Sequence, residues 1–155
     1  MLAPMDAAEV EAQVEGFIAR YDDAIAAQIR AARTIMRARL PGALELVWDN
    51  YNALAIGYGP TERQADILFS ITAYPRWVSL FLVGGPRLSD PHGLLKGEGS
   101  RMRHIVLEAA ERLNDLEVAD LMDQILRNAR TPLDPRQPQR TIVKSISAKQ
   151  RPRRK

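Results

Sequence analysis

The sequence predicts an α+β domain in which helices near the two ends of the chain flank a sheet of five mainly antiparallel strands. Near the N-terminus, apolar residues recur at intervals of three and four, which is typical of a helix. Between residues 44 and 107 the interval becomes two, which is typical of half-buried strands. A second helical stripe follows residue 114. Strands grouped between terminal helices favour α+β layering over a parallel α/β sheet.

The N-terminal helical region begins with a capping box. Asp6 is followed three residues later by Glu9, so we expect a helix from Ala7. The stripe must end before Pro41, and it is either one helix or two helices broken near residues 21–23. Its apolar members are Val10, Val14, Phe17, Tyr21, Ile25, Ile29, Ala32 and Met36.

Short connections between the strands predict antiparallel neighbours. In the fourth strand the apolar alternation is assigned to Trp77, Phe81 and Val83. Asn114 and Glu117 form a second capping box, which opens a C-terminal helix expected to pack on one face of the sheet. The predicted strands are 44–48, 54–58, 67–73, 77–83 and 102–107, with a long loop rich in glycine and proline at 84–100.

Charge divides the chain into two parts. Residues 136–155 contain eight Lys or Arg and no acid, which leaves 14 basic against 19 acidic residues, a net charge of −5, in residues 1–135. We expect one domain over residues 1–130 and a basic, flexible tail over 131–155, in which residues 141–143 could dock as a short strand. The acidic body is a poor nucleic-acid surface, whereas the tail predicts weak contact without sequence preference.

Several function classes are disfavoured by composition. The chain has no cysteine, which excludes disulfides, thiolate metal sites and a cysteine nucleophile. The N-terminus lacks the basic and apolar regions of a secretory signal, and the longest apolar run, from Val78 to Val83, is too short to cross a bilayer. We therefore expect a cytoplasmic protein with no membrane partner. Because no Gly-x-Ser-x-Gly nucleophile elbow is present, a binding protein is favoured over an enzyme.

The glycine-rich segment 93–99 and its neighbours form a candidate ligand site. Glycines allow backbone N–H groups to approach an anion, and Lys96 would add a charge. The alternative is structural: the glycines satisfy turn geometry and the polar side chains cap backbone groups. The aromatic residues Trp48, Tyr51, Tyr74 and Trp77 are favoured as core or sheet packing over a base-stacking platform, which with the acidic body argues against a single-strand nucleic-acid binder. The predicted ligand residues are Trp48, Tyr51, Asp90, His92, Lys96, Arg103 and His104.

A group of acids in the N-terminal helical region is a candidate metal site. Carboxylate oxygens on a helix face suit iron ions without a closed cage. The alternative is a solvated helix face, in which Glu9 serves the capping box. The group consists of Glu9, Glu11, Glu15, Asp22 and Asp23.

Three segments carry a family resemblance: Leu88–Ile105 with its Asp-Pro-His-Gly-Leu-Leu run, Trp48–Tyr51, and Val78–Phe81. Together they resemble the bacterial YdhG-like family, domain of unknown function 1801, over about residues 9–129. The chain departs from the family at Asp49 and Asn50, where a glycine and a proline are common.

The resemblance implies an antiparallel sheet packed on helices. Since some members are similar to frataxins and are described as iron chaperones, it also implies weakly bound iron and an unknown protein partner or small ligand. The alternative function is a small-ligand or anion-binding module, which could be an enzyme, at residues 90–104.

Overall fold

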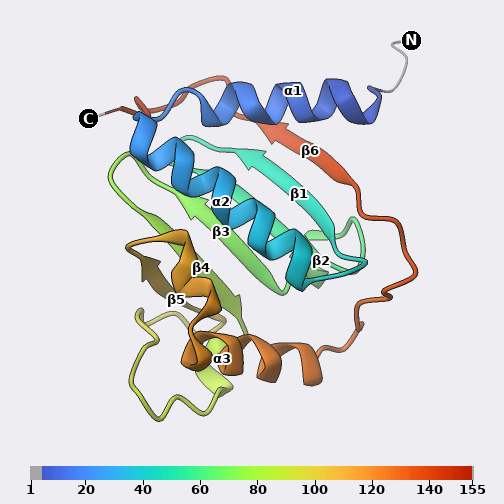
Figure 1. The fold of residues 1–155 in the computed structure, drawn as a ribbon, viewed down its shortest axis with the longest axis vertical. Coiled ribbons are helices and arrows are strands. Elements are labelled where there is room, and N and C mark those ends of the chain that lie inside the picture. The colour runs from blue at the N-terminus through green and yellow to red at the C-terminus, as the bar shows by residue number, and fades with distance from the viewer. Residues whose placement is uncertain (1–4, 155) are drawn as a thin grey trace.

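Residues 5–154 form one mixed six-stranded sheet with three α-helices on one of its faces, as described by a computed structural model (Figure 1). The α+β class predicted from the sequence is confirmed. The helices are α1 (Ala7–Ile18), α2 (Asp23–Arg39) and α3 (Leu116–Arg127), with short 3₁₀ segments η1 (Gln64–Asp66), η2 (Gly85–Arg87) and η3 (Ala110–Asn114). The strands are β1 (Leu44–Asp49), β2 (Leu54–Gly59), β3 (Phe69–Ala73), β4 (Val78–Val83), β5 (Met102–Leu107) and β6 (Thr141–Ile146).

The N-terminal stripe forms two helices. The predicted capping box is present at its start, where the Glu9 N–H donates to Asp6 Oδ1 at 2.8 Å. The break falls at Tyr21, whose buried hydroxyl donates to the carbonyl oxygen of Ala73 at 2.7 Å and accepts from the Leu54 N–H at 3.2 Å. Tyr21 therefore leaves the helical path to join α1 and α2 to strands β2 and β3.

The strand order is β5-β4-β3-β2-β1-β6, and the strands from β1 to β5 are antiparallel neighbours as predicted. The count of five strands was wrong, because β6 adds a sixth strand parallel to β1. β6 comes from the segment expected to be a flexible tail. The docking considered for residues 141–143 is present there, and the strand continues to Ile146.

The main core lies between the helices and one face of the sheet. In β4, Val78, Leu80 and Leu82 are in this core, so the alternation assigned to Trp77, Phe81 and Val83 was wrong. Both sets are largely apolar, and a period of two cannot decide which set faces the helices.

The second predicted capping box was also wrong. The N-cap of α3 is Asp115, and Asn114 Oδ1 instead accepts a hydrogen bond from Arg39 Nη2 at 2.8 Å.

A smaller apolar cluster of Leu44, Leu46 and Ile67 lies on the face of the sheet away from the helices. In the described part of the chain, no helix has the length and apolar character needed to cross a membrane.

Candidate functional site

Two carboxylates of β1, Glu45 and Asp49, lie on the helix-facing side of the sheet and are 2% and 1% exposed. Ionised carboxylates in such a place need counter-charges and hydrogen bonds. Each has them, and both sets of partners include residues of the C-terminal segment. These two clusters hold the predicted tail against the domain, and the same segment helps to form a pocket beside them.

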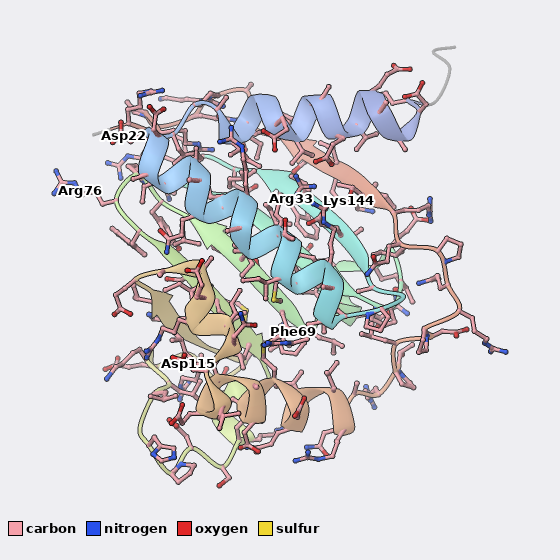
Figure 2. All side chains as sticks on the ribbon, in the orientation of Figure 1. Asp22, Arg33, Phe69, Arg76, Asp115 and Lys144 are labelled. Carbon is pink, nitrogen blue, oxygen red and sulfur yellow. The ribbon has the colours of Figure 1, made fainter. Side chains whose placement is uncertain are left out.

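The first cluster surrounds Glu45. Arg33 Nη2 lies 2.8 Å from its carboxylate, while the Tyr58 and Thr141 hydroxyls donate to it at 2.6 and 2.8 Å. Arg33 also donates to Glu11 at 2.9 and 3.0 Å, and Figure 2 shows it between α1 and α2. Burial would raise the pKa of Glu45, but Arg33 and the two hydroxyl hydrogen bonds hold it below its ordinary value. The cluster is closed to ligands and joins α1, α2, β1, β2 and β6.

The second cluster surrounds Asp49. Its carboxylate accepts from the buried Arg153 at 3.0 Å, from Gln150 at 2.9 Å and from Arg20 at 3.2 Å. The Arg153 guanidinium also lies 5.9 Å from the centre of the Tyr21 ring, within the range of a cation–π contact. Asp49 therefore anchors the end of the chain beside the turn between β1 and β2.

An open pocket of about 490 Å³ lies next to this anchor, and we call it the arginine–aromatic pocket. It is formed by the β1–β2 turn, the β3–β4 turn and the C-terminal segment. The Tyr74 and Trp77 rings are stacked, with centroids 4.7 Å apart and planes 24° apart, and Trp77 remains 43% exposed. The lining residues are Asn52, Tyr74, Pro75, Arg76, Trp77, Arg151, Pro152 and Arg154.

The charge of this pocket is positive. Three arginines, Arg76, Arg151 and Arg154, line it, and no carboxylate is among its described lining residues. Arg154 lies 3.5 Å from the partly exposed Asp22, and Arg76 extends outward from the molecule in Figure 2. The Arg151 N–H donates to the carbonyl oxygen of Tyr51 at 2.9 Å, which holds this part of the chain in place. The site thus combines stacked rings with several cations.

The predicted ligand residues divide between distant strands. Trp48 is on β1 and lies against Gly57 on the face away from the helices, while Tyr51 is exposed in the turn beside the arginine–aromatic pocket. His104 is on β5, with three strands between β5 and β1. The structure therefore does not bring Trp48 and Tyr51 together with residues 90–104.

In the glycine-rich loop, Asp90 acts as a cap. Its two carboxylate oxygens accept from the Leu94 and Leu95 N–H groups, each at 2.9 Å. His92 and Asp90 line a hollow of about 230 Å³ whose other charged lining residues are the acids Glu117 and Asp120. This charge does not favour an anion.

The basic residues of the segment lie outside that hollow. Lys96 is exposed and pairs through its backbone with His104, with N···O distances of 2.8 and 3.0 Å. The Arg103 guanidinium donates to the carbonyl oxygens of Gly99 and Met102. Lys96 and Arg103 are therefore not arranged around the same pocket as His92.

Three of the five predicted metal residues pair with arginines, and the other two are exposed. Glu11 and Glu15 contact Arg33 and Arg30, respectively, and Asp22 contacts Arg154. Glu9 is exposed in the first turn of α1, and Asp23 is exposed in the first turn of α2. In residues 5–154, no three His, Asp or Glu side chains come together as a group that could hold a metal ion.

Sequence reasoning missed most of the pocket. It favoured core or sheet packing for Tyr74 and Trp77 over a base-stacking platform, and it assigned residues 151–154 to a tail. The available signal was an aromatic residue on each side of Pro75-Arg76, since a short turn brings its two ends together.

The comparisons with known proteins find no similar family model, curated protein or solved structure. The YdhG-like resemblance stays a prediction.

Proposed function

We propose that this chain is a non-enzymatic binding protein for single-stranded nucleic acid and that the arginine–aromatic pocket is its contact site. The observation that carries the proposal is the stacked Tyr74–Trp77 pair in a pocket that three arginines also line. Proteins that hold single strands without sequence preference combine aromatic stacking with cations that follow the backbone. The partly exposed Trp77 would stack on a base, and the arginines would contact phosphates.

The proposed function is still that of a binding protein, as predicted, but its ligand is not iron. Single-strand binding, which the sequence disfavoured, is proposed because the stacked Tyr74 and Trp77 share a pocket with arginines. Three of the five acids proposed for iron, Glu11, Glu15 and Asp22, are paired with arginines. The proposal also extends the nucleic-acid contact expected of the basic tail, because Arg151 and Arg154 meet Arg76 and Trp77 of the domain at one place. A pocket of about 490 Å³ has room for a base with its phosphate.

Fluorescence anisotropy with a labelled oligothymidylate of about twelve nucleotides, a length within the usual site sizes, tests the proposal at low salt. Trp77→Ala should weaken binding about tenfold or more, because one stacked base is lost. Arg76→Ala should weaken it by a smaller factor. The matched control is Arg63→Ala, an exposed arginine that follows β2 at the opposite end of the strand from the pocket. Equal loss in Arg76→Ala and Arg63→Ala would contradict the proposed location.

The chain has two tryptophans, which gives a second readout. Quenching by the oligonucleotide should persist in Trp48→Phe and disappear in Trp77→Phe. Thymidine monophosphate serves as the comparison ligand, because it offers the same base and one phosphate. Binding of the mononucleotide as tight as that of the oligonucleotide would assign the pocket to a free nucleotide and refute the single-strand proposal.

A further inference from the structure

Among residues 5–154, no further strand pairs with the outer edge of β6, which lies beside α1. It is the terminal strand, and it is hydrogen bonded to β1 on one side only. At its ends, the Glu45 N–H donates to the Arg140 carbonyl at 2.8 Å, and the Ser147 N–H donates to the Asp49 carbonyl at 2.9 Å. Because bonding residues alternate along a parallel ladder, the N–H and C=O groups of Thr141 and Val143 are directed away from β1. Such an edge can accept a further strand.

A groove of about 780 Å³ follows this edge and is lined by residues of α1 on its other side. Figure 1 shows α1 running beside β6. Its two large exposed apolar side chains, those of the groove, are Met5 and Ile146, which are 46% and 50% exposed. The partly buried Val10 and Val143 also line it. An extended segment paired with β6 would place every second side chain over these apolar groups.

The charges of the groove select the partner. Arg37, Arg140 and Lys144 line it, and its acid, Glu11, is already bound to Arg33. Arg140 lies 3.4 Å from the Glu62 carboxylate and Lys144 donates to the Glu62 carbonyl oxygen at 3.1 Å, so an acidic partner would share these two cations with Glu62. A second copy of this chain would place the same cations opposite one another, because a two-fold interface is self-complementary. Lys144 also lies where the β1–β6 register shifts, and a lysine and an irregularity on an edge strand both oppose edge-to-edge pairing of copies.

We propose that the groove binds an acidic, extended peptide segment of a partner protein, which adds a strand to the edge of β6. Main-chain hydrogen bonds to Thr141 and Val143 would hold the segment. Its apolar side chains would contact Met5 and Ile146, and its acids would face the cations. This site lies on a different part of the molecule from the arginine–aromatic pocket and does not depend on the function proposed for it.

A capped peptide of about eight alternating Glu and Val residues, long enough to cover the strand, is the probe. In NMR hydrogen exchange with the full chain, the Thr141 and Val143 amides should become protected when it binds. N-methylation of every second peptide bond distinguishes strand addition through main-chain hydrogen bonds from simple charge attraction between the peptide and the groove. Methylation of the set that faces β6 should abolish binding, and methylation of the other set should preserve it. Equal affinity of the two methylated peptides would overturn the proposal.

Lys144→Glu should lower the affinity for the acidic peptide about tenfold. Lys149 belongs to the same segment but lies outside the groove, so Lys149→Glu should change this affinity less than about twofold. The two variants have the same net charge as each other, because each replaces one lysine by one glutamate. Two further results would overturn the proposal: equal effects of these two substitutions, or tighter binding of the matching Lys and Val peptide. A third result would also overturn the proposal. If the Thr141 and Val143 amides are protected without peptide, and the protection increases with protein concentration, the edge binds a second copy of the chain.

Discussion

Replacement of Arg33 by Met tests whether the cluster around Glu45 organises the fold. The substitution removes the buried guanidinium and leaves an apolar side chain of similar length. Glu45, which is 2% exposed, then keeps the hydroxyl hydrogen bonds of Tyr58 and Thr141 but loses its counter-charge. Removing one partner of a buried pair costs about 3–5 kcal/mol. Glu11 loses the same partner at little cost, because it can turn to solvent.

The expected loss is large for a chain of this size. Total stabilities of about 5–15 kcal/mol are typical, so Arg33→Met should remove a substantial fraction of the free energy of unfolding. At about 2–4 °C per kcal/mol, the melting temperature should fall by about 6–20 °C. Urea unfolding followed by circular dichroism measures the difference. The matched control is Arg30→Met on the same helix, because Arg30 and its partner Glu15 are both well exposed, and such pairs contribute at most about 1 kcal/mol.

The pH dependence separates the lost charge pair from lost packing. In Arg33→Met, burial is no longer opposed by a cation, so the pKa of Glu45 should rise above its ordinary value of 4.5. Protonation then relieves the unpaired charge as the pH falls. The stability deficit of the variant should therefore shrink between pH 7 and pH 4. A deficit no larger than that of Arg30→Met, or one that stays constant over this pH range, would refute the charge-pair argument.

Three further outcomes follow from the buried groups. Arg33 lowers the pKa values of Glu45 and Glu11, so their contribution to the free energy of unfolding is present above pH 4.5 and is lost as the pH falls below that value. A urea midpoint unchanged from pH 6 to pH 3 would contradict this. Burial and Glu45 raise the pKa of Tyr58 well above 10.0, so the midpoint should fall as the pH rises past 10, since the unfolded tyrosine ionises first. Tyr21→Phe should cost about 1–3 kcal/mol, because two buried backbone groups lose their partner; a melting temperature within 1 °C of the parent would show otherwise.

The α+β class and the antiparallel strands could be predicted because their signals are local. Alternation places Leu54, Ile56 and Tyr58 on one face of β2, and all three are buried there. Asp6 and Glu9 cap a helix within four residues of sequence. Nothing outside each segment is needed to recognise these patterns.

β6 and the buried acids of β1 could not be predicted in the same way. The alternation of Leu44, Leu46 and Trp48 marks one apolar face of β1, yet Glu45 and Asp49 are buried on the other face. Their partners lie on α2 and near the C-terminus, so the spacing within β1 carries no information about them. The basic composition of residues 136–155 therefore predicts a flexible tail, because the buried acids that pair with this segment lie elsewhere in the sequence.

The pocket was missed for a related reason. It is assembled from residues 52, 74–77 and 151–154, which are distant in the sequence. The resemblance to a known family directed attention to residues 90–104, where Asp90 caps the loop and the hollow beside His92 is acidic. Motif spacing finds sites within one segment, whereas this site depends on the anchor between Asp49 and Arg153.

The salt dependence of oligonucleotide binding distinguishes the pocket from a tail that binds through all its charges. Eight cations on phosphates would lower affinity about 2,000-fold between about 50 and 200 mM salt, from a slope of about 0.7 per contact on single strands. The described cations are not all available. Arg153 is committed to Asp49, and Arg136 lies 3.1 Å from Asp134. Lys155, the last of the eight, lies outside the described residues.

The pocket itself offers three cations: Arg76, Arg151 and Arg154. Three phosphate contacts give a loss of only about 20-fold over the same salt range. Anisotropy titrations at four or more salt concentrations provide the slope, and Arg151→Ala should lower it by about 0.7 because one contact is removed. Because Arg151 also belongs to the basic segment, Arg76→Ala is the variant that distinguishes the two modes. A slope near that of eight contacts, left unchanged by Arg76→Ala, would mean that oligonucleotides bind along the whole basic segment and that the aromatic pocket is not the site of contact.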